Sequence, residues 1–113
     1  MYELRLRKRI YDEVKNDIIK PMTNSEIKDL LKNIFKEKGR PDKCFFNDKY
    51  CHSPKKYGDF PIVFGHIKPL SKGGSITDVS NVIWLCERHN WIMGDKTLIE
   101  LRDISRSIYK KLL

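Results

Sequence analysis

Residues 64–95 read FGHIKPLSKGGSITDVSNVIWLCERHNWIMGD, and this stretch carries most of the chemical information in the chain. It starts with a short apolar run that contains His66 and continues through a glycine-containing loop to Asn81. It ends with Cys86 and His89 in a Cys-x-x-His spacing, and Asn90 follows directly. Apolar segments separate these polar residues, so the pattern predicts short regular elements that carry them at or near their ends.

The elements predicted for this stretch are two strands and one helix. Residues 60–67 are rich in aromatic and β-branched side chains, which favours a first strand with His66 near its end. Residues 82–85 form the second strand of a hairpin, and a short helix runs from Glu87 to Gly94. The intervening loop carries Gly73 and Gly74, which tolerate positive φ and let a backbone approach a phosphate closely.

Two helices are expected before this stretch. The first runs from about Leu4 to Lys20 and ends at Pro21, because proline forces the preceding residue out of the α region. Its apolar stripe is predicted to consist of Leu4, Tyr11, Val14 and Ile18. The second helix begins at a capping box formed by Thr23 and Glu26 and continues with apolar residues at helical spacing: Ile27, Leu30, Leu31, Ile34 and Phe35.

The second helix ends at Gly39, and a further helix follows the hairpin region. Glycine just past a helix, with Pro41 two residues on, is a common C-terminal signal. Thr97 and Glu100 form another capping box, ahead of apolar residues at helical spacing. This last helix is expected to pack on the rest of the chain or to form a dimer contact.

Composition limits the classes of partner and location. The chain has 113 residues and a net charge of +8, with a pI near 9.5, so a polyanion is the leading partner class. No run of 18 apolar residues is present, so no membrane association is expected. The basic N-terminus lacks a following apolar segment of the secretory type. We therefore expect an intracellular, cytoplasmic protein.

The three cysteines and one nearby histidine predict a structural zinc site. An odd number of cysteines in an intracellular chain argues against a disulfide framework and for metal ligation. Cys44, Cys51, Cys86 and His89 form a Cys₃His set, which is a usual ligand set for tetrahedral zinc. Six residues separate Cys44 from Cys51, a looser spacing than Cys-x-x-Cys, and His52 is an alternative fourth ligand. Residues 41–60 are poor in apolar groups, so such a site would give this loop something to fold around.

The middle of the chain, from Cys44 to Asp95, resembles the HNH endonucleases, whose site is a β-hairpin and a helix folded around a metal ion. More narrowly, it is similar to an HNH subclass, seen in some restriction and viral nucleases, that reads G-H-I…G-G…N-L…C-x-x-C-N-x-x-M-G. The residues that match are Gly65-His66-Ile67, Gly73-Gly74, Asn81, Cys86, Asn90 and Met93-Gly94. His89 stands where a cysteine is more common in this subclass.

The resemblance implies an α+β fold in a single domain. Residues 41–95 would form a ββα-metal core with a zinc knuckle, preceded by a helical hairpin in residues 1–40 and followed by a helix in residues 96–113. His66 would be the general base that accepts a proton from the attacking water, a role that suits an imidazole near neutral pH. Asn81 would either orient the His66 ring or tie the hairpin loop.

The resemblance also implies a catalytic divalent ion, with Asn90 presenting an oxygen to it. Hard oxygen ligands favour Mg²⁺ or Mn²⁺. Many HNH sites place a metal ligand immediately before the catalytic histidine, whereas this chain has Gly65 there, a feature that the Gly-His-Ile subclass shares. The remaining ligands must then come from elsewhere, and Asp59, Asp95 and the His66 ring are the candidates.

The predicted activity is metal-dependent hydrolysis of phosphodiester bonds in double-stranded DNA, with a restriction or phage role. Basic residues expected to contact phosphates near the site are Lys68, Lys72, Arg88 and Lys96. Cutting both strands would most simply need a homodimer. Two alternatives stay open, a non-catalytic zinc-stabilised DNA-binding module and an RNA-directed nuclease.

Overall fold

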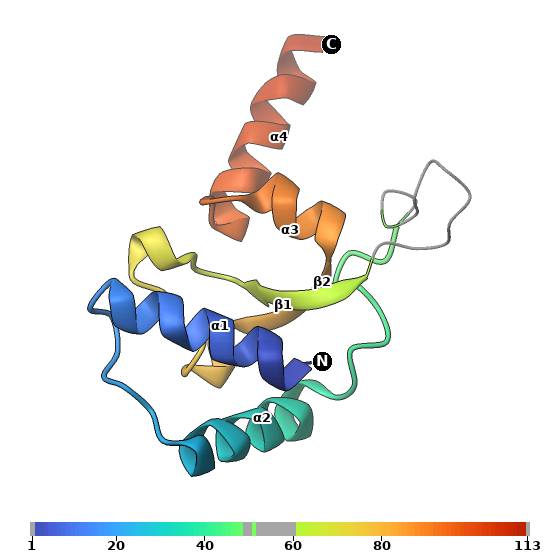
Figure 1. Cartoon of the computed structure of the whole chain (residues 1–113). Helices are drawn as coiled ribbons and strands as arrows, with labels where there is room; N and C mark the ends of the chain where they lie inside the picture. Colours follow the sequence, from blue (N-terminus) through green and yellow to red (C-terminus); the bar gives the residue numbers. More distant parts are fainter. Residues whose placement is uncertain (1, 49–50, 52–60, 113) are drawn as a thin grey trace.

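The computed structural model describes residues 2–48, 51 and 61–112. It is a mixed α+β structure with four helices and a two-stranded antiparallel sheet. The elements are α1 (Tyr2–Lys15), α2 (Asn24–Lys38), β1 (Ile62–His66), β2 (Val82–Cys86), α3 (Glu87–Met93) and α4 (Leu98–Leu112). The helices α1 and α2 lie on one side of the β1–β2 hairpin and α3 on the other, so the hairpin is the middle layer (Figure 1).

The predicted helix signals around α2, α3 and α4 are confirmed. Thr23 caps α2, with its hydroxyl accepting from the Glu26 N–H and the Glu26 carboxylate accepting from the Thr23 N–H. Thr97 and Glu100 make the same reciprocal bonds at the start of α4. Gly39 follows α2 with φ 72°, and Gly94 follows α3 with φ 52°, which are conformations that favour glycine. Local sequence therefore sets the ends of these helices.

The prediction for α1 is wrong in its length and in its buried face. The helix ends at Lys15 rather than Lys20, and Asp17 adopts φ 58° just beyond it. Leu4 and Tyr11 are 72% and 65% exposed, whereas the buried residues of α1 are Leu6, Ile10 and Glu13. Of the predicted stripe, Val14 does pack against the core. In this orientation Leu6 and Ile10 join the hydrophobic core, and Glu13 accepts hydrogen bonds from the loop between the strands.

The hairpin pairs Phe64 with Trp84, Gly65 with Ile83 and His66 with Val82. Because side chains alternate along a strand, Phe64, His66, Val82 and Trp84 share one face. Phe64, Val82 and Trp84 pack there against buried residues of α1 and α2, including Leu6, Ile10, Ile27, Leu30 and Ile34. All five residues of β2 are buried, as expected for a strand covered on both faces.

The opposite face of the hairpin packs against α3 and the cysteine-bearing loop. Ile83 and Leu85 form a second buried cluster with Met93 and the three cysteines. Gly65 lies on this face, and a Cβ added there would stand 2.3 Å from Cδ1 of Leu85. A side chain at the position before His66 would therefore displace the Leu85 side chain from this cluster.

The last helix, α4, extends away from the rest of the molecule (Figure 1). Leu101 packs against the cluster around the cysteines, and Lys72 forms an ion pair with Glu100 near the start of the helix. Ile99 and Ile104 are 63% and 41% exposed. Within the described residues, no helix has the length and apolar character needed to cross a bilayer.

Candidate functional site

Three cysteines and one histidine converge on a single point beside the hairpin. Their ligand atoms, the Sγ atoms of Cys44, Cys51 and Cys86 and a ring nitrogen of His89, all lie within 4.8 Å of one another, and all four residues are buried. The distances from His89 Nδ1 to the three sulfur atoms are 3.5, 3.5 and 3.1 Å. Tetrahedral zinc, with bonds of about 2.3 Å to sulfur and about 2.0 Å to nitrogen, places such atoms roughly 3.5 Å apart.

These four residues are therefore positioned to hold a metal ion, and the donor set suits structural zinc. The predicted Cys₃His set is brought together in full, with Cys51 in the fourth position. The alternative ligand, His52, lies outside the described residues. Cys86 caps α3, and its Sγ accepts the backbone N–H of His89 at 3.3 Å, which is the local geometry of a metal-binding knuckle.

Groups around the cluster orient the imidazole of His89. Its Nε2 lies 3.4 Å from Oδ1 of Asp48, while Nδ1 faces the sulfur atoms. A carboxylate on the second ring nitrogen is the usual outer partner of a metal-binding histidine, because it fixes the tautomer. Phe46 stacks on the ring with a centroid distance of 4.7 Å. The backbone N–H of Phe45 donates to the Trp84 carbonyl at 2.7 Å, which ties the loop to β2.

The thiols would need a cation to become ligands. Burial raises the pKa of Cys86 to about 12 and raises the pKa of Cys51. For Cys44, burial acts in the same direction, but the N–H groups of Cys86, Phe46 and Asn47 lower its pKa overall. A bound cation would favour the thiolate form of all three, so metal binding at this cluster should release protons.

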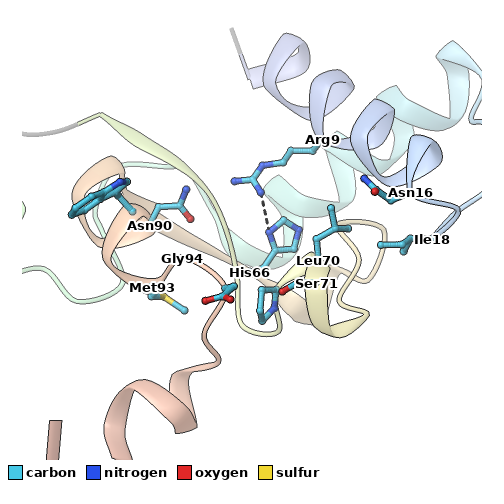
Figure 2. A pocket seen from close by; sticks show the side chains of 12 residues that line it. Arg9, Asn16, Ile18, His66, Leu70, Ser71, Asn90, Met93 and Gly94 are labelled. Carbon is cyan, nitrogen blue, oxygen red and sulfur yellow. Dashed lines mark hydrogen bonds between the residues drawn. The ribbon is translucent and has the colours of Figure 1, made fainter. Parts of the chain in front are cut away.

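A second site surrounds His66, on the other side of β1. A pocket of about 740 Å³ opens where α1, the loop after β1 and α3 meet. Figure 2 shows the Arg9 side chain reaching from α1 to the His66 ring, with Asn90 projecting from α3 toward the same hollow. Trp91 and Asp95 also line the pocket. Two of the three predicted catalytic residues, His66 and Asn90, therefore line the same pocket.

The His66 ring is buried between two charged side chains of α1. Arg9 lies with Nη1 3.3 Å from Nδ1 of His66, and its Nη2 donates to the Phe64 carbonyl at 2.8 Å. Nε2 of His66 lies 4.0 Å from Oε2 of Glu13. Burial first, and the Arg9 charge second, lower the pKa of His66 to about 4. The ring is therefore neutral at physiological pH.

Neither Arg9 nor Glu13 is among the site residues that the sequence motifs predict. A signal was present, because Leu6, Ile10 and Glu13 follow the i, i+4, i+7 spacing of one helix face. Glu13 on that face is 1% exposed. A glutamate on the same helix face as two apolar residues is expected to be buried with them, and a buried carboxylate needs hydrogen-bond or charged partners.

The Asn81 side chain holds the loop between the two strands together. Among the described residues, it makes no hydrogen bond to the His66 ring. Its Oδ1 accepts from the Lys68 N–H at 2.7 Å, and its Nδ2 donates to the Lys68 and Ser75 carbonyls. A Cβ added at Gly74 would stand 1.8 Å from the Lys68 carbonyl oxygen, so this loop requires glycine there. Of the two roles predicted for Asn81, the hydrogen bonds fit the one in which it holds the hairpin loop and not the one in which it orients the His66 ring.

The remaining predicted site residues are placed as follows. Asp95 lines the His66 pocket and lies 3.8 Å from the Lys96 ammonium, whereas Asp59 lies outside the described residues. Lys68 and Arg88 are exposed, and Lys72 pairs with Glu100. Of the two tryptophans, Trp84 is buried, whereas Trp91 is 76% exposed.

Comparison of the chain with protein-family models, with curated proteins and with solved structures found no match.

Proposed function

We propose that this protein is a metal-dependent endonuclease of the HNH type that hydrolyses phosphodiester bonds in double-stranded DNA inside the cell. The observation that carries the proposal is that His66 and Asn90 line the same pocket. Asn81 holds the loop of the hairpin that bears His66, and a Cys₃His cluster lies on the other face of that hairpin. The order strand, tied loop, strand and helix agrees with the ββα-metal arrangement that the motifs predict. The net charge of +8 agrees with a nucleic-acid substrate.

In this proposal, His66 accepts a proton from the attacking water as the water oxygen bonds to phosphorus and the bond to the leaving oxygen breaks. A neutral imidazole is the form that this role needs. In the free protein the Arg9 guanidinium covers Nδ1 of His66. A scissile phosphate entering the pocket would attract that guanidinium as a bidentate partner and so uncover the nitrogen.

Oxygen donors for a divalent ion are present in the same pocket. Asn90 offers an amide oxygen, and Asp95 offers the carboxylate that Gly65 cannot. This donor type suits Mg²⁺ or Mn²⁺. Such an ion, when bound, would stabilise negative charge on the phosphate and on the leaving oxygen. The Cys₃His cluster, in contrast, has four protein ligands and the closed character of a structural site.

The test is a digest of supercoiled plasmid by the wild-type protein and by His66→Ala. Added Mg²⁺ or Mn²⁺ is compared with buffer freed of divalent ions by a chelating resin, because a soluble chelator would also remove zinc from the cluster. Metal-dependent nicking or linearisation, reduced at least a hundredfold in His66→Ala, is expected. Equal zinc content and circular dichroism of the two proteins control for folding. Absence of cleavage by the wild type with either ion contradicts the proposal.

A second candidate is a zinc-stabilised DNA-binding module without catalysis. The observation that favours it is the burial of His66, which is 8% exposed with Arg9 against Nδ1. A module of this kind would retard DNA in a salt-sensitive manner and would leave the plasmid intact with every metal. Competition between DNA and RNA in the same assays separates a DNA-directed protein from an RNA-directed nuclease.

A further inference from the structure

We propose that Glu13 of α1 is a positioning residue for His66, which fixes the ring with its proton on Nε2 and leaves Nδ1 as the proton acceptor. This inference rests on the proposed nuclease function, because it assigns a partner to the proposed general base. It goes beyond the motifs of the hairpin, since Glu13 lies on a helix outside the segment from Cys44 to Asp95 that carries the resemblance.

Glu13 is held rigidly under the hairpin loop. It is 1% exposed, and its carboxylate accepts the backbone N–H of Ile76 at 2.9 Å and the hydroxyl of Ser75 at 2.6 Å. Arg9, the other charged neighbour of the His66 ring, lies one helical turn before Glu13 on α1. Burying a carboxylate carries a desolvation penalty, so a position this well fixed by hydrogen bonds points to a role for Glu13 in the fold or in the site.

The contacts of His66 select one tautomer of the neutral ring. Arginine has only donors, so the Arg9 guanidinium at 3.3 Å requires a lone pair on Nδ1. The ring proton then lies on Nε2, which is buried and has no hydrogen-bond partner among the described residues. The Glu13 Oε2 atom stands 4.0 Å from this orphan nitrogen. It is the acceptor that a proton on Nε2 would require.

The arrangement gives Glu13 a role during the reaction. When Nδ1 accepts a proton from water, the ring becomes an imidazolium, and a carboxylate beside Nε2 stabilises that charge. A separation of 4.0 Å is longer than a hydrogen bond, and catalytic hydrogen bonds in free enzymes are often long and shorten in the substrate complex. We expect the Nε2 to Glu13 contact to shorten when a phosphate draws Arg9 away from Nδ1.

A purely structural role for Glu13 is the competing explanation, because the same carboxylate fastens Ser75 and Ile76. Glu13→Gln is nearly isosteric and keeps an oxygen for the Ile76 N–H, but it removes the charge beside Nε2. Ser75→Ala removes a hydrogen bond to the Glu13 carboxylate without altering the group that faces His66. The two variants therefore separate loss of the charge from loosening of the loop.

The experiment compares plasmid cleavage and the ring tautomer in wild type, Glu13→Gln, Ser75→Ala and His66→Ala. In Glu13→Gln, kcat should fall about tenfold to a hundredfold with KM for DNA unchanged, while Ser75→Ala should cut within about twofold of the wild-type rate. Nitrogen NMR of the His66 ring at pH 7 should show the proton on Nε2 in the wild type. In Glu13→Gln, the population with the proton on Nδ1 should rise.

The outcomes separate this inference from the proposed function. Cleavage by wild type that is lost in His66→Ala but retained at the parental rate in Glu13→Gln overturns the role of Glu13 alone. Equal losses in Glu13→Gln and Ser75→Ala also overturn it, in favour of a structural role. A wild-type ring protonated on Nδ1 overturns it even if Glu13→Gln does not fold. No cleavage by the wild type with any divalent ion overturns both proposals.

Discussion

The buried state of His66 predicts a specific loss of stability as the pH falls. Burial and the Arg9 charge lower the pKa of this histidine to about 4 in the folded protein, against an unfolded value of 6.5. Between these two values the unfolded chain binds a proton that the folded protein does not. The free energy of unfolding therefore falls as pH decreases from 6.5 to 4, and is constant with respect to this group above pH 6.5.

The magnitude follows from the difference between the two pKa values. Each pH unit of difference corresponds to about 1.4 kcal/mol, so the contribution of His66 amounts to about 3 kcal/mol at pH 4. The carboxylate of Glu13, 4.0 Å from Nε2, favours the protonated ring and makes this figure an upper value. A loss of this size is a large part of the stability of a small domain.

The assay is urea unfolding at several pH values from 4 to 7 for the wild type and for His66→Gln, with zinc present throughout. Acid also protonates the cysteines of the metal cluster, but this affects both proteins equally. The stability of wild type minus that of the variant should therefore decrease by up to about 3 kcal/mol from pH 7 to pH 4, because glutamine does not titrate. A difference that does not change with pH, or that increases as the pH falls, would contradict a lowered pKa of His66 in the folded protein.

Three further predictions concern the metal cluster and the pocket. Wild-type protein purified without chelator should contain about one zinc per chain by elemental analysis, and Cys51→Ser should lose the zinc and melt at a markedly lower temperature; a folded, metal-free wild type would contradict this. Asp95→Asn should raise the Mg²⁺ concentration for half-maximal cleavage about tenfold or more, whereas Asp103→Asn on α4 should leave it unchanged, and equal values for both would exclude Asp95 as a ligand. Trp91 is 76% exposed and free to stack on unpaired bases, so single-stranded DNA should quench the tryptophan fluorescence of the wild type but not that of Trp91→Phe, in which only buried Trp84 emits; quenching that persists in Trp91→Phe would contradict stacking on Trp91.

Much of the fold follows from local sequence signals. The capping boxes at Thr23 and Thr97 and the glycines at 39 and 94 act within one helical turn, so the boundaries of α2, α3 and α4 could be predicted closely. The hairpin was also predictable, because β2 is a continuous apolar run bounded by Asn81 and the knuckle. The metal cluster was predictable because cysteine has few other roles in such a chain.

The face of α1 could not be predicted in the same way, because it depends on contacts across the chain. The nearest partners of Glu13 are Ser75 and Ile76, 62 and 63 positions away. Hydrophobic spacing alone selected Leu4 and Tyr11, since a helix of mixed composition offers more than one apolar stripe. The face that packs on the hairpin buries Leu6 and Ile10 in the core and also lets Glu13 accept from the Ile76 N–H.

The absence of a ligand at position 65 is explained by the structure rather than by the motif. Gly65 lies against the Leu85 side chain in the packed face of the hairpin, so a carboxylate there would require Leu85 to move. Three candidates for the remaining ligands of the proposed divalent ion follow from the sequence: Asp59, Asp95 and the His66 ring. Of these, Asp95 and His66 line the same pocket as Asn90. For this reason the carboxylate ligand of the proposed divalent ion is assigned to Asp95, just after α3.

Chemical rescue of His66→Ala by imidazole is the most direct test of His66 as the proton acceptor. Removing the His66 side chain leaves a space that opens into a pocket of about 740 Å³, large enough to admit free imidazole. If His66 is the proton acceptor, His66→Ala should be inactive on supercoiled plasmid with Mg²⁺, and added imidazole should restore cleavage in proportion to the concentration of its neutral form. Cleavage by His66→Ala at the parental rate, or an active wild type whose inactive variant shows no rescue, would contradict the role of His66 as the proton acceptor.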